Sequence, residues 1–188
     1  YNDYLMPNHF VNYDIVNNIG VYSYSNYHHF DTVVHLAAKV QVGESVQIPT
    51  HYYETNINGT INVLNDIGYD NFIFASTGVA CNPENPYGLS KRCAEDIVKE
   101  YCTKNDKTYT TFRFYNVIGS DGTAPTNPDG LFYNLIRAKN TGTFTIYGND
   151  YNTPDGTAIR DYVHVNEICN SIKLAIEAPA NSLQNLGH

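Results

Sequence analysis

Apolar residues fall along the chain in two patterns, which predict two kinds of element. Short continuous runs rich in Val, Ile, Phe and Tyr are typical of strands covered on both faces, as in a parallel sheet. These runs lie at 10–15, 32–37, 71–76, 109–114 and 161–165. Longer segments that repeat an apolar residue every three or four positions predict helices. These segments lie at 51–67, 86–101, 131–138 and 167–178. Because strands and helices alternate, the sequence predicts an α/β fold with right-handed crossovers.

A loop is predicted at 119–130, which contains three Gly and two Pro. It separates a first part, residues 1–118, from a smaller second part, residues 119–188. The strand predicted at 161–165 belongs to the second part and is a candidate to return to the sheet of the first. We therefore expect two lobes.

The composition excludes several classes of function. The 188 residues carry a net charge of −8 and only 11 Lys and Arg, too few for the basic face of a nucleic-acid-binding protein. No apolar run approaches the roughly 18 to 20 residues that a membrane helix needs, so we expect no membrane partner. The seven His show no ligand spacing, which disfavours a metal site. The four Cys form no Cys-x-x-Cys pair, which indicates reduced thiols in a cytoplasmic protein.

Tyr87 and Lys91 are four residues apart on the helix predicted at 86–101. This spacing places both side chains on one helix face, one turn apart. An ammonium group near a phenol lowers the phenol pKa, and the phenol can then act as a general acid or base. The chain has 17 Tyr, however, so such a pair also arises by chance. The alternative is an exposed Lys beside a packed Tyr.

Small and hydroxyl-bearing residues follow the predicted strands at their carboxyl ends, the edge where open α/β sheets bind ligands. Ser76 and Thr77 end one such strand, as reactive groups or as ordinary turn hydroxyls. The stretch 35–38 (His-Leu-Ala-Ala) either lets a flat ligand approach the backbone or packs tightly on a helix. Asn56, a poor helix former inside a predicted helix, either bonds a loop or ligand or is solvated.

Two arginines stand near strand ends. Arg113 belongs to the stretch 113–116, which closes the fourth predicted strand. Arg160 follows a Gly-containing loop and precedes a strand, where it could grip a phosphate with two hydrogen bonds. The alternative for Arg160 is a surface ion pair with Asp155 or Asp161.

Taken together, four segments resemble the extended short-chain dehydrogenase/reductase superfamily and, within it, the sugar-nucleotide 4-epimerases of the NAD-dependent epimerase/dehydratase family. The segments are 42–47, 52–60, 86–91 and 147–165, and the likeness runs from about residue 10 to residue 187. The last segment favours the epimerases over the related dehydratases. Dehydratases tend to carry an acidic pair just after the catalytic Thr, where this chain has Gly78 and Val79.

The resemblance implies a partial Rossmann-type doubly wound parallel sheet that lacks its first strands, with part of a smaller substrate lobe. Residues 1–118 would form the NAD-binding part and residues 119–188 the substrate-binding part. The resemblance also implies NAD as cofactor, a UDP-sugar as substrate, and a homodimer formed through the helices at 51–67 and 86–101.

The resemblance further implies roles for individual residues. Tyr87 would take the proton from the sugar 4-hydroxyl, Thr77 would bond the 4-oxygen, and Lys91 would hold the nicotinamide ribose and lower the Tyr87 pKa. The implied NAD-binding residues are Asp14, Ile15, Leu36, Ala37, Ala38, Lys39, Val40, Asn56, Ser76, Tyr87, Lys91 and Tyr115. The implied UDP-sugar-binding residues are Thr77, Tyr87, Asn116, Asn134, Leu135, Thr145, Tyr147 and Arg160.

The sequence also departs from this family. It contains no G-x-G-x-x-G or G-x-x-G-x-x-G turn, which would cradle the cofactor pyrophosphate at a helix N-terminus. The first residues show no signal-peptide pattern and no Met at position 1, so we expect an incomplete chain. Two alternatives to the epimerase stay open. One is another dehydratase or reductase on the same scaffold, and the other is a non-catalytic remnant that binds a nucleotide sugar.

Overall fold

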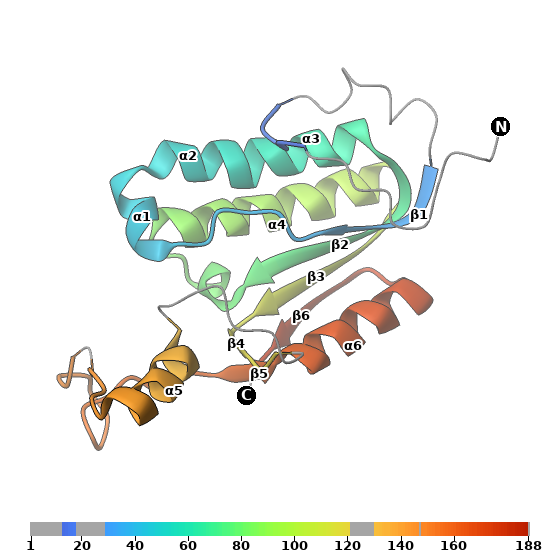
Figure 1. Ribbon diagram of the computed structural model, residues 1–188. Helices are drawn as coiled ribbons and strands as arrows, with labels where there is room; N and C mark the ends of the chain where they lie inside the picture. Colours follow the sequence, from blue (N-terminus) through green and yellow to red (C-terminus); the bar gives the residue numbers. More distant parts are fainter. Residues whose placement is uncertain (1–12, 18–28, 121–129, 147, 188) are drawn as a thin grey trace.

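A four-stranded parallel sheet lies at the centre of the computed structural model, which describes residues 13–17, 29–120, 130–146 and 148–187 (Figure 1). Its strands are β1 (His29–His35), β2 (Gly68–Thr77), β3 (Thr108–Phe114) and β6 (Ser182–Leu186), in the order β1-β2-β3-β6. Every neighbouring pair is parallel. All the carboxyl ends of these strands therefore meet at one edge of the sheet.

Helices cover both faces of this sheet (Figure 1). On one face lie α3 (Gly59–Asp66) and α4 (Pro86–Lys104), and on the other lies α6 (Val165–Glu177). Side chains of β2 alternate between the two faces, as a pleated strand requires. Phe72 and Phe74 pack into the cluster under α3 and α4, whereas Ile73 packs with Ala175 of α6. This arrangement confirms the predicted α/β sheet of Rossmann type.

The helix predicted at 51–67 is a composite of three pieces. It consists of α2 (Pro49–Tyr53), the π-helical turn η2 (Glu54–Asn58) and α3, which follow one another without a break. A π turn holds one residue more than an α turn and frequently marks a functional position. A further short helix, α1 (Val42–Gln47), was not predicted, because six residues are too few to show a helical period.

Two predicted strands differ from the structure. Residues 13–17 form a turn rather than the end of a strand at 10–15, because the Asp14 carboxylate accepts the backbone N–H of Val16 at 3.0 Å. Residues 10–12 lie outside the described part. The strand predicted at 161–165 forms as β5 (Tyr162–His164), but it pairs with β4 (Asn116–Ile118) in a separate two-stranded sheet. It cannot join the main sheet beside β3, because β6 occupies that position.

Three elements complete the described chain. They are the short 3-10 helix η3 (Gly78–Cys81) after β2, the helix α5 (Leu131–Thr141), and the strand β6 of the main sheet, which ends the described chain. The strand β6 was not predicted, since its polar sequence Ser-Leu-Gln-Asn-Leu has no continuous apolar run. None of the helices in the described residues is both long and apolar enough to cross a membrane.

Candidate functional site

The structure brings Thr77 and Tyr87 together at the carboxyl edge of the sheet. Thr77 ends β2, and Tyr87 lies in the first turn of α4, where Asn85 caps the helix by accepting the N–H of Gly88 at 2.9 Å. The helix approaches closely because residue 88 is glycine. A Cβ there would lie 2.8 Å from a side-chain carbon of Val79. The Thr77 hydroxyl accepts the N–H of Val79 at 3.4 Å and lies close enough to the Tyr87 phenol to lower its pKa.

The Tyr87 pKa is raised rather than lowered in this structure. Burial raises it, because a phenolate loses solvation when it leaves water, and the hydrogen bond from Thr77 lowers it in part. The expected lowering by Lys91 is therefore not seen in the isolated chain. Lys91 is itself buried on the same helix.

Lys91 lies beneath the protein surface, which rejects the alternative of an exposed lysine. Lys91 is only 3% exposed, and its Nζ lies 4.2 Å from the centroid of the Phe74 ring. Burial lowers the Lys91 pKa to about 7, while the charge of Glu95 opposes this and raises it. The ammonium group therefore titrates within the physiological range.

His35 at the end of β1 is buried beside Lys91. Its Nε2 lies 3.0 Å from the Thr60 hydroxyl, and its ring stacks on Phe74 at 5.7 Å between centroids. Burial and, to a smaller extent, the positive charge of Lys91 lower the His35 pKa to about 4. Because Thr60 donates its own hydrogen to the Asn56 carbonyl, its oxygen accepts from a neutral His35 that carries the proton on Nε2.

The buried His35 gives a prediction about acid stability. Its folded pKa lies below the unfolded value of 6.5, so between pH 6.5 and 4 the unfolded chain binds a proton that the folded chain does not. Stability therefore falls as pH is lowered through this window, by up to about 1.4 kcal/mol per pH unit from this residue. His35→Gln keeps a donor for Thr60 but cannot ionise. Urea unfolding at several pH values should give a flatter dependence for the variant, and identical slopes would contradict this account.

Asn56 is neither solvated nor facing outward. Its side chain accepts the backbone N–H of Lys39 at 2.8 Å and donates to the Lys39 carbonyl at 3.0 Å. It also donates to the Ser90 hydroxyl of α4 at 2.9 Å. The π turn η2 thus carries the residue that holds the segment after β1 against α4. The sequence identified Asn56 as a candidate but not this two-way bond to the backbone.

The segment after β1 leaves apolar side chains open at the edge of the sheet. Leu36 and Val40 are 59% and 57% exposed, and Ala37 and Ala38 lie between them. Exposed aliphatic groups beside a buried polar cluster are typical of a ligand-binding crevice. The Lys39 ammonium is 3.6 Å from the Glu44 carboxylate.

Sequence analysis missed Tyr52, which lies at the centre of the helices around the site. Its hydroxyl donates to Glu44 at 2.6 Å and accepts the backbone N–H of Gln41 at 3.1 Å. Its ring meets the Tyr87 ring edge to face, with 6.4 Å between centroids. Burial and the Glu44 bond raise the Tyr52 pKa to about 12, so the phenol stays protonated and acts as a support for Tyr87.

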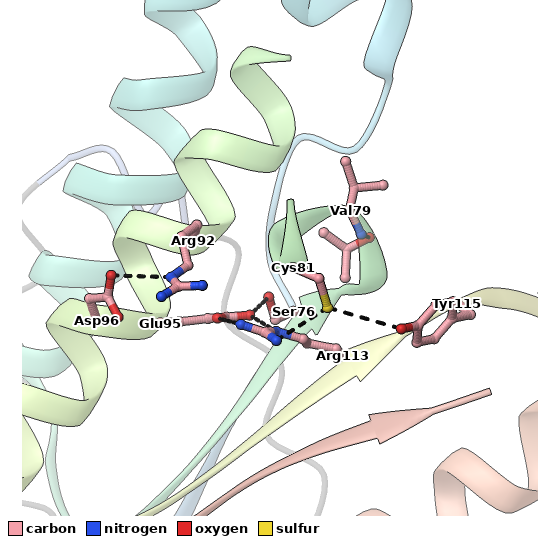
Figure 2. Close-up of polar contacts among 9 residues, drawn as sticks. Ser76, Val79, Cys81, Arg92, Glu95, Asp96, Arg113 and Tyr115 are labelled. Carbon is pink, nitrogen blue, oxygen red and sulfur yellow. Dashed lines mark hydrogen bonds and ion pairs between the residues drawn. The ribbon is translucent and has the colours of Figure 1, made fainter. Parts of the chain in front are cut away.

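A buried polar cluster lies behind Thr77 and was also missed (Figure 2). The Glu95 carboxylate accepts two hydrogen bonds from Arg113, from Nε at 2.8 Å and from Nη2 at 2.6 Å, and a third from the Ser76 hydroxyl at 2.5 Å. Arg113 also donates to the Cys81 sulfur at 3.2 Å. Ser76 therefore points into the protein interior, and the prediction that it binds the cofactor stays untested.

Tyr115, another predicted cofactor residue, joins β3 to β4. Its backbone N–H donates to the Leu186 carbonyl at 3.2 Å. A Cβ at Gly78 would lie 2.7 Å from the Tyr115 ring, so only glycine permits this approach of η3. Asp14 is exposed, whereas Ile15 packs against the main core. The structure thus places Tyr115 at the edge of the sheet and turns Ile15 inward.

The remaining predicted substrate residues gather around a separate pocket of about 730 Å³ beside α5 and β5. Asn116, Asn134, Thr145 and Arg160 line it, but Leu135 does not. Tyr147 lies outside the described residues. Within the described chain, Arg160 forms no ion pair with Asp155 or Asp161. Its Nη1 donates to the backbone carbonyl of Ile159 at 2.9 Å.

The pocket is also lined by a positively charged side chain, that of Arg137, which was not predicted from the sequence. Arg137 of α5 lines it together with Arg160. Arg137 sits on the predicted helix 131–138, but neither a strand end nor a motif marks it, so only the folded structure could identify it. Two arginines and two asparagines around one hollow form a site suited to an anion.

A family model described as "NAD dependent epimerase/dehydratase family" matches residues 2–187 of this chain. The chain belongs to this family. It is 34% identical over 168 residues to a UDP-glucose 4-epimerase from Yersinia enterocolitica, covering 75% of this chain and 50% of that protein. It is 35% identical over 164 residues to the human UDP-glucose 4-epimerase, covering 72% of this chain and 47% of that protein. The chain thus spans about half the length of these relatives.

Solved structures of this family share the fold. A UDP-glucose 4-epimerase from Brucella ovis in complex with NAD is 32% identical with a TM-score of 0.73, covering 84% of this chain and 57% of that one. A UDP-glucose 4-epimerase from Bifidobacterium longum, in complex with NAD+ and UDP, is 26% identical with a TM-score of 0.75. It covers 94% of this chain and 62% of that one. These likenesses confirm the fold predicted for this member of the epimerase/dehydratase family.

Proposed function

We propose that this member of the epimerase/dehydratase family is part of an NAD-dependent enzyme that interconverts UDP-galactose and UDP-glucose at sugar carbon 4. The observation that carries the proposal is the convergence of Thr77, Tyr87 and Lys91 at the carboxyl edge of the sheet. A hydroxyl, a phenol and an ammonium group at one edge of the sheet would form a general acid–base site. The relatives named above are UDP-glucose 4-epimerases, which supports the same substrate class.

The described residues fit the nicotinamide half of NAD. Leu36 and Val40 offer exposed apolar side chains in the segment that follows β1, at the same edge of the sheet as Thr77. A flat, partly apolar ring and a ribose with two hydroxyls suit such a surface. The sequence has no Gly-rich turn for the pyrophosphate, so we expect weaker binding of NAD to this chain than to a protein that contains one.

In the proposed reaction, NAD would supply the hydride acceptor and donor at sugar carbon 4, by way of a 4-keto sugar. Tyr87 takes the proton from the 4-hydroxyl and later returns it, while Thr77 holds the same oxygen by a hydrogen bond. Burial raises the Tyr87 pKa, so Lys91 would favour the phenolate only in its charged form and against the effect of burial. Tyr52 and Asn56 keep the helix of Tyr87 and the segment after β1 in place.

The pocket of Arg137 and Arg160 would hold the UDP part of the substrate. We expect Arg160→Ala to weaken UDP binding by about 10- to 100-fold, because a charge-assisted hydrogen bond contributes about 1.5–3 kcal/mol. Calorimetric titration with UDP measures this effect. Arg92→Ala is the matched control, since Arg92 pairs with Asp96 on the exposed face of α4. Equal loss in both variants would contradict a specific role for Arg160.

The decisive experiment is a titration of the 188-residue chain with NAD, followed by a turnover assay with UDP-galactose. Micromolar NAD binding and the formation of UDP-glucose would support the proposal. Activity on dTDP-glucose alone would instead favour a dehydratase. Binding of UDP without turnover would identify a nucleotide-sugar-binding chain, and no binding of any of these would reject the assignment for this chain.

Two further expectations belong to the same proposal. A homodimer would form through α4 and the composite helix of α2, η2 and α3, which correspond to the predicted segments 86–101 and 51–67. The protein would work in the cytoplasm, where free thiols persist. The cysteines Cys81, Cys93, Cys102 and Cys169 are all unpaired by disulfides, which supports that expectation.

A further inference from the structure

The carboxylate of Glu95 joins three elements that meet behind the site. It comes from α4, receives both bonds of Arg113 from β3, and receives the Ser76 hydroxyl from the end of β2 (Figure 2). The side chains of Glu95 and Arg113 are 3% and 11% exposed. Ser76 and Arg113 are direct neighbours in the register of β2 and β3. One buried group therefore links the strand end, its neighbouring strand and the helix.

The position of Glu95 relates this cluster to the reacting groups. Tyr87, Lys91 and Glu95 are spaced by four residues, so they lie along one face of α4, and all three are buried. Ser76, which Glu95 holds, directly precedes Thr77. The cluster is thus one residue from Thr77 on the strand and one turn from Lys91 on the helix.

Stability alone does not explain such a cluster. A buried ion pair loses its solvation on folding, and well-packed apolar residues of similar volume are often as stabilising. Three polar groups that hydrogen-bond one another behind a site suit a role in orientation, and none of their buried nitrogen or oxygen atoms lacks a partner.

We propose that Glu95 is a positioning residue, which holds the Thr77-bearing end of β2 against the helix that carries Tyr87 and Lys91. This inference rests on the function proposed above, because it assigns Glu95 its role through Thr77 and Lys91. Glu95 acts through Ser76 and through its charge, and it does not touch the reacting sugar.

The charge of Glu95 also acts on Lys91. The titratable groups near Lys91 are Tyr87 and Glu95, each one turn away on its own helix, and His35 on β1. Phe74 of β2 lies under its Nζ, and Arg113 of β3 forms an ion pair with Glu95. His35 stays neutral above pH 4, so Glu95 is the anion that opposes the effect of burial on the Lys91 pKa. Loss of this anion would leave Lys91 less often charged.

The test compares Glu95→Gln with Asp96→Asn, the next residue on α4, whose exposed carboxylate pairs with Arg92 (Figure 2). NMR of the 188-residue chain, with ¹³C-labelled lysine, measures the titration midpoint of Lys91. Amide hydrogen exchange measures how firmly the N–H of Val79 is held by Thr77. We expect Glu95→Gln to lower the Lys91 midpoint from about 7 by about one pH unit and to speed exchange at Val79 about tenfold. Asp96→Asn should change neither.

A second variant covers the case in which Glu95→Gln does not fold. Ser76→Ala removes one hydroxyl and keeps the ion pair, so exchange at Val79 should rise while the Lys91 midpoint stays in place. Exchange at Val79 that matches the unmodified chain in either folded variant overturns the positioning role. An unchanged Lys91 midpoint in Glu95→Gln overturns the role of its charge.

Turnover separates this inference from the proposed function. In a chain that converts UDP-galactose, Glu95→Gln should lower kcat about 10- to 100-fold while KM stays within about threefold, because misplacement affects the chemical step. A 10- to 100-fold rise in KM with unchanged kcat would overturn the positioning role of Glu95. Absence of turnover in the unmodified chain would count against the proposed function alone, since NMR and exchange decide the role of Glu95 without sugar or cofactor.

Discussion

Replacing Tyr87 by Phe is expected to lower turnover of UDP-galactose by about 10³-fold, in the middle of the range for loss of a general acid–base group. The change removes one oxygen and keeps the ring that packs against Tyr52 at 6.4 Å. NAD binding should change little, because Leu36, Val40 and Lys91 stay in place. Rates from a coupled assay and affinities from calorimetry measure the two effects separately.

Tyr101→Phe is the matched control for Tyr87. Tyr101 lies on the same helix, and its ring packs beside the core cluster at the far end of α4. We expect full activity for this variant. Unchanged turnover in Tyr87→Phe would remove the phenol from the mechanism, and a loss of activity in both variants would indicate damage to the helix instead.

Replacing Arg113 by Leu is expected to lower the free energy of unfolding by about 3–5 kcal/mol. The variant leaves the Glu95 carboxylate buried at 3% exposure without the two N–H donors that compensate its charge. Ser76 alone cannot replace them, since it contributes one hydrogen bond. Urea unfolding at neutral pH measures the change.

An exposed ion pair on α4, the helix that carries Glu95, provides the comparison for Arg113. Arg92 and Asp96 are 43% and 67% exposed and lie 3.3 Å apart, so Arg92→Leu should change the free energy of unfolding by less than about 1 kcal/mol. If both variants lose the same amount, burial is not the reason for the effect, and the cluster of Glu95 has no special place in the fold.

Much of the fold could be predicted from the sequence, because the central strands carry dense apolar runs. Phe72 to Phe74 identify β2, and the three-and-four spacing after Pro86 identifies α4. The strand β6 could not be found, since its hydrogen bonds to β3 determine it and its side chains are largely polar. Tertiary pairing thus overrides local pattern at the edge of the sheet.

The positions of Thr77 and Tyr87 could be predicted, because Thr77 ends an apolar strand and Tyr87 follows the proline that begins α4. Those of Glu95, Tyr52 and Arg137 could not, because each depends on a partner distant in sequence. The sequence also did not predict the direction of the Tyr87 pKa. Spacing indicates that Lys91 is near, but only the folded chain reveals that burial acts more strongly than charge.

The π turn η2 (Glu54–Asn58) lies between helical segments that pack on the core, and it carries Asn56, which holds the segment after β1. Removing one residue there would convert the π turn into an ordinary α turn, and α2 and α3 could still present Tyr52 and Val63 to the interior. The bonds of Asn56 to Lys39 would be lost with the extra residue. A difference of one residue in this helix would therefore leave its apolar contacts with the core in place and release the segment after β1 from α4. We expect removal of this residue to weaken mainly the binding of ligands at the edge of the sheet.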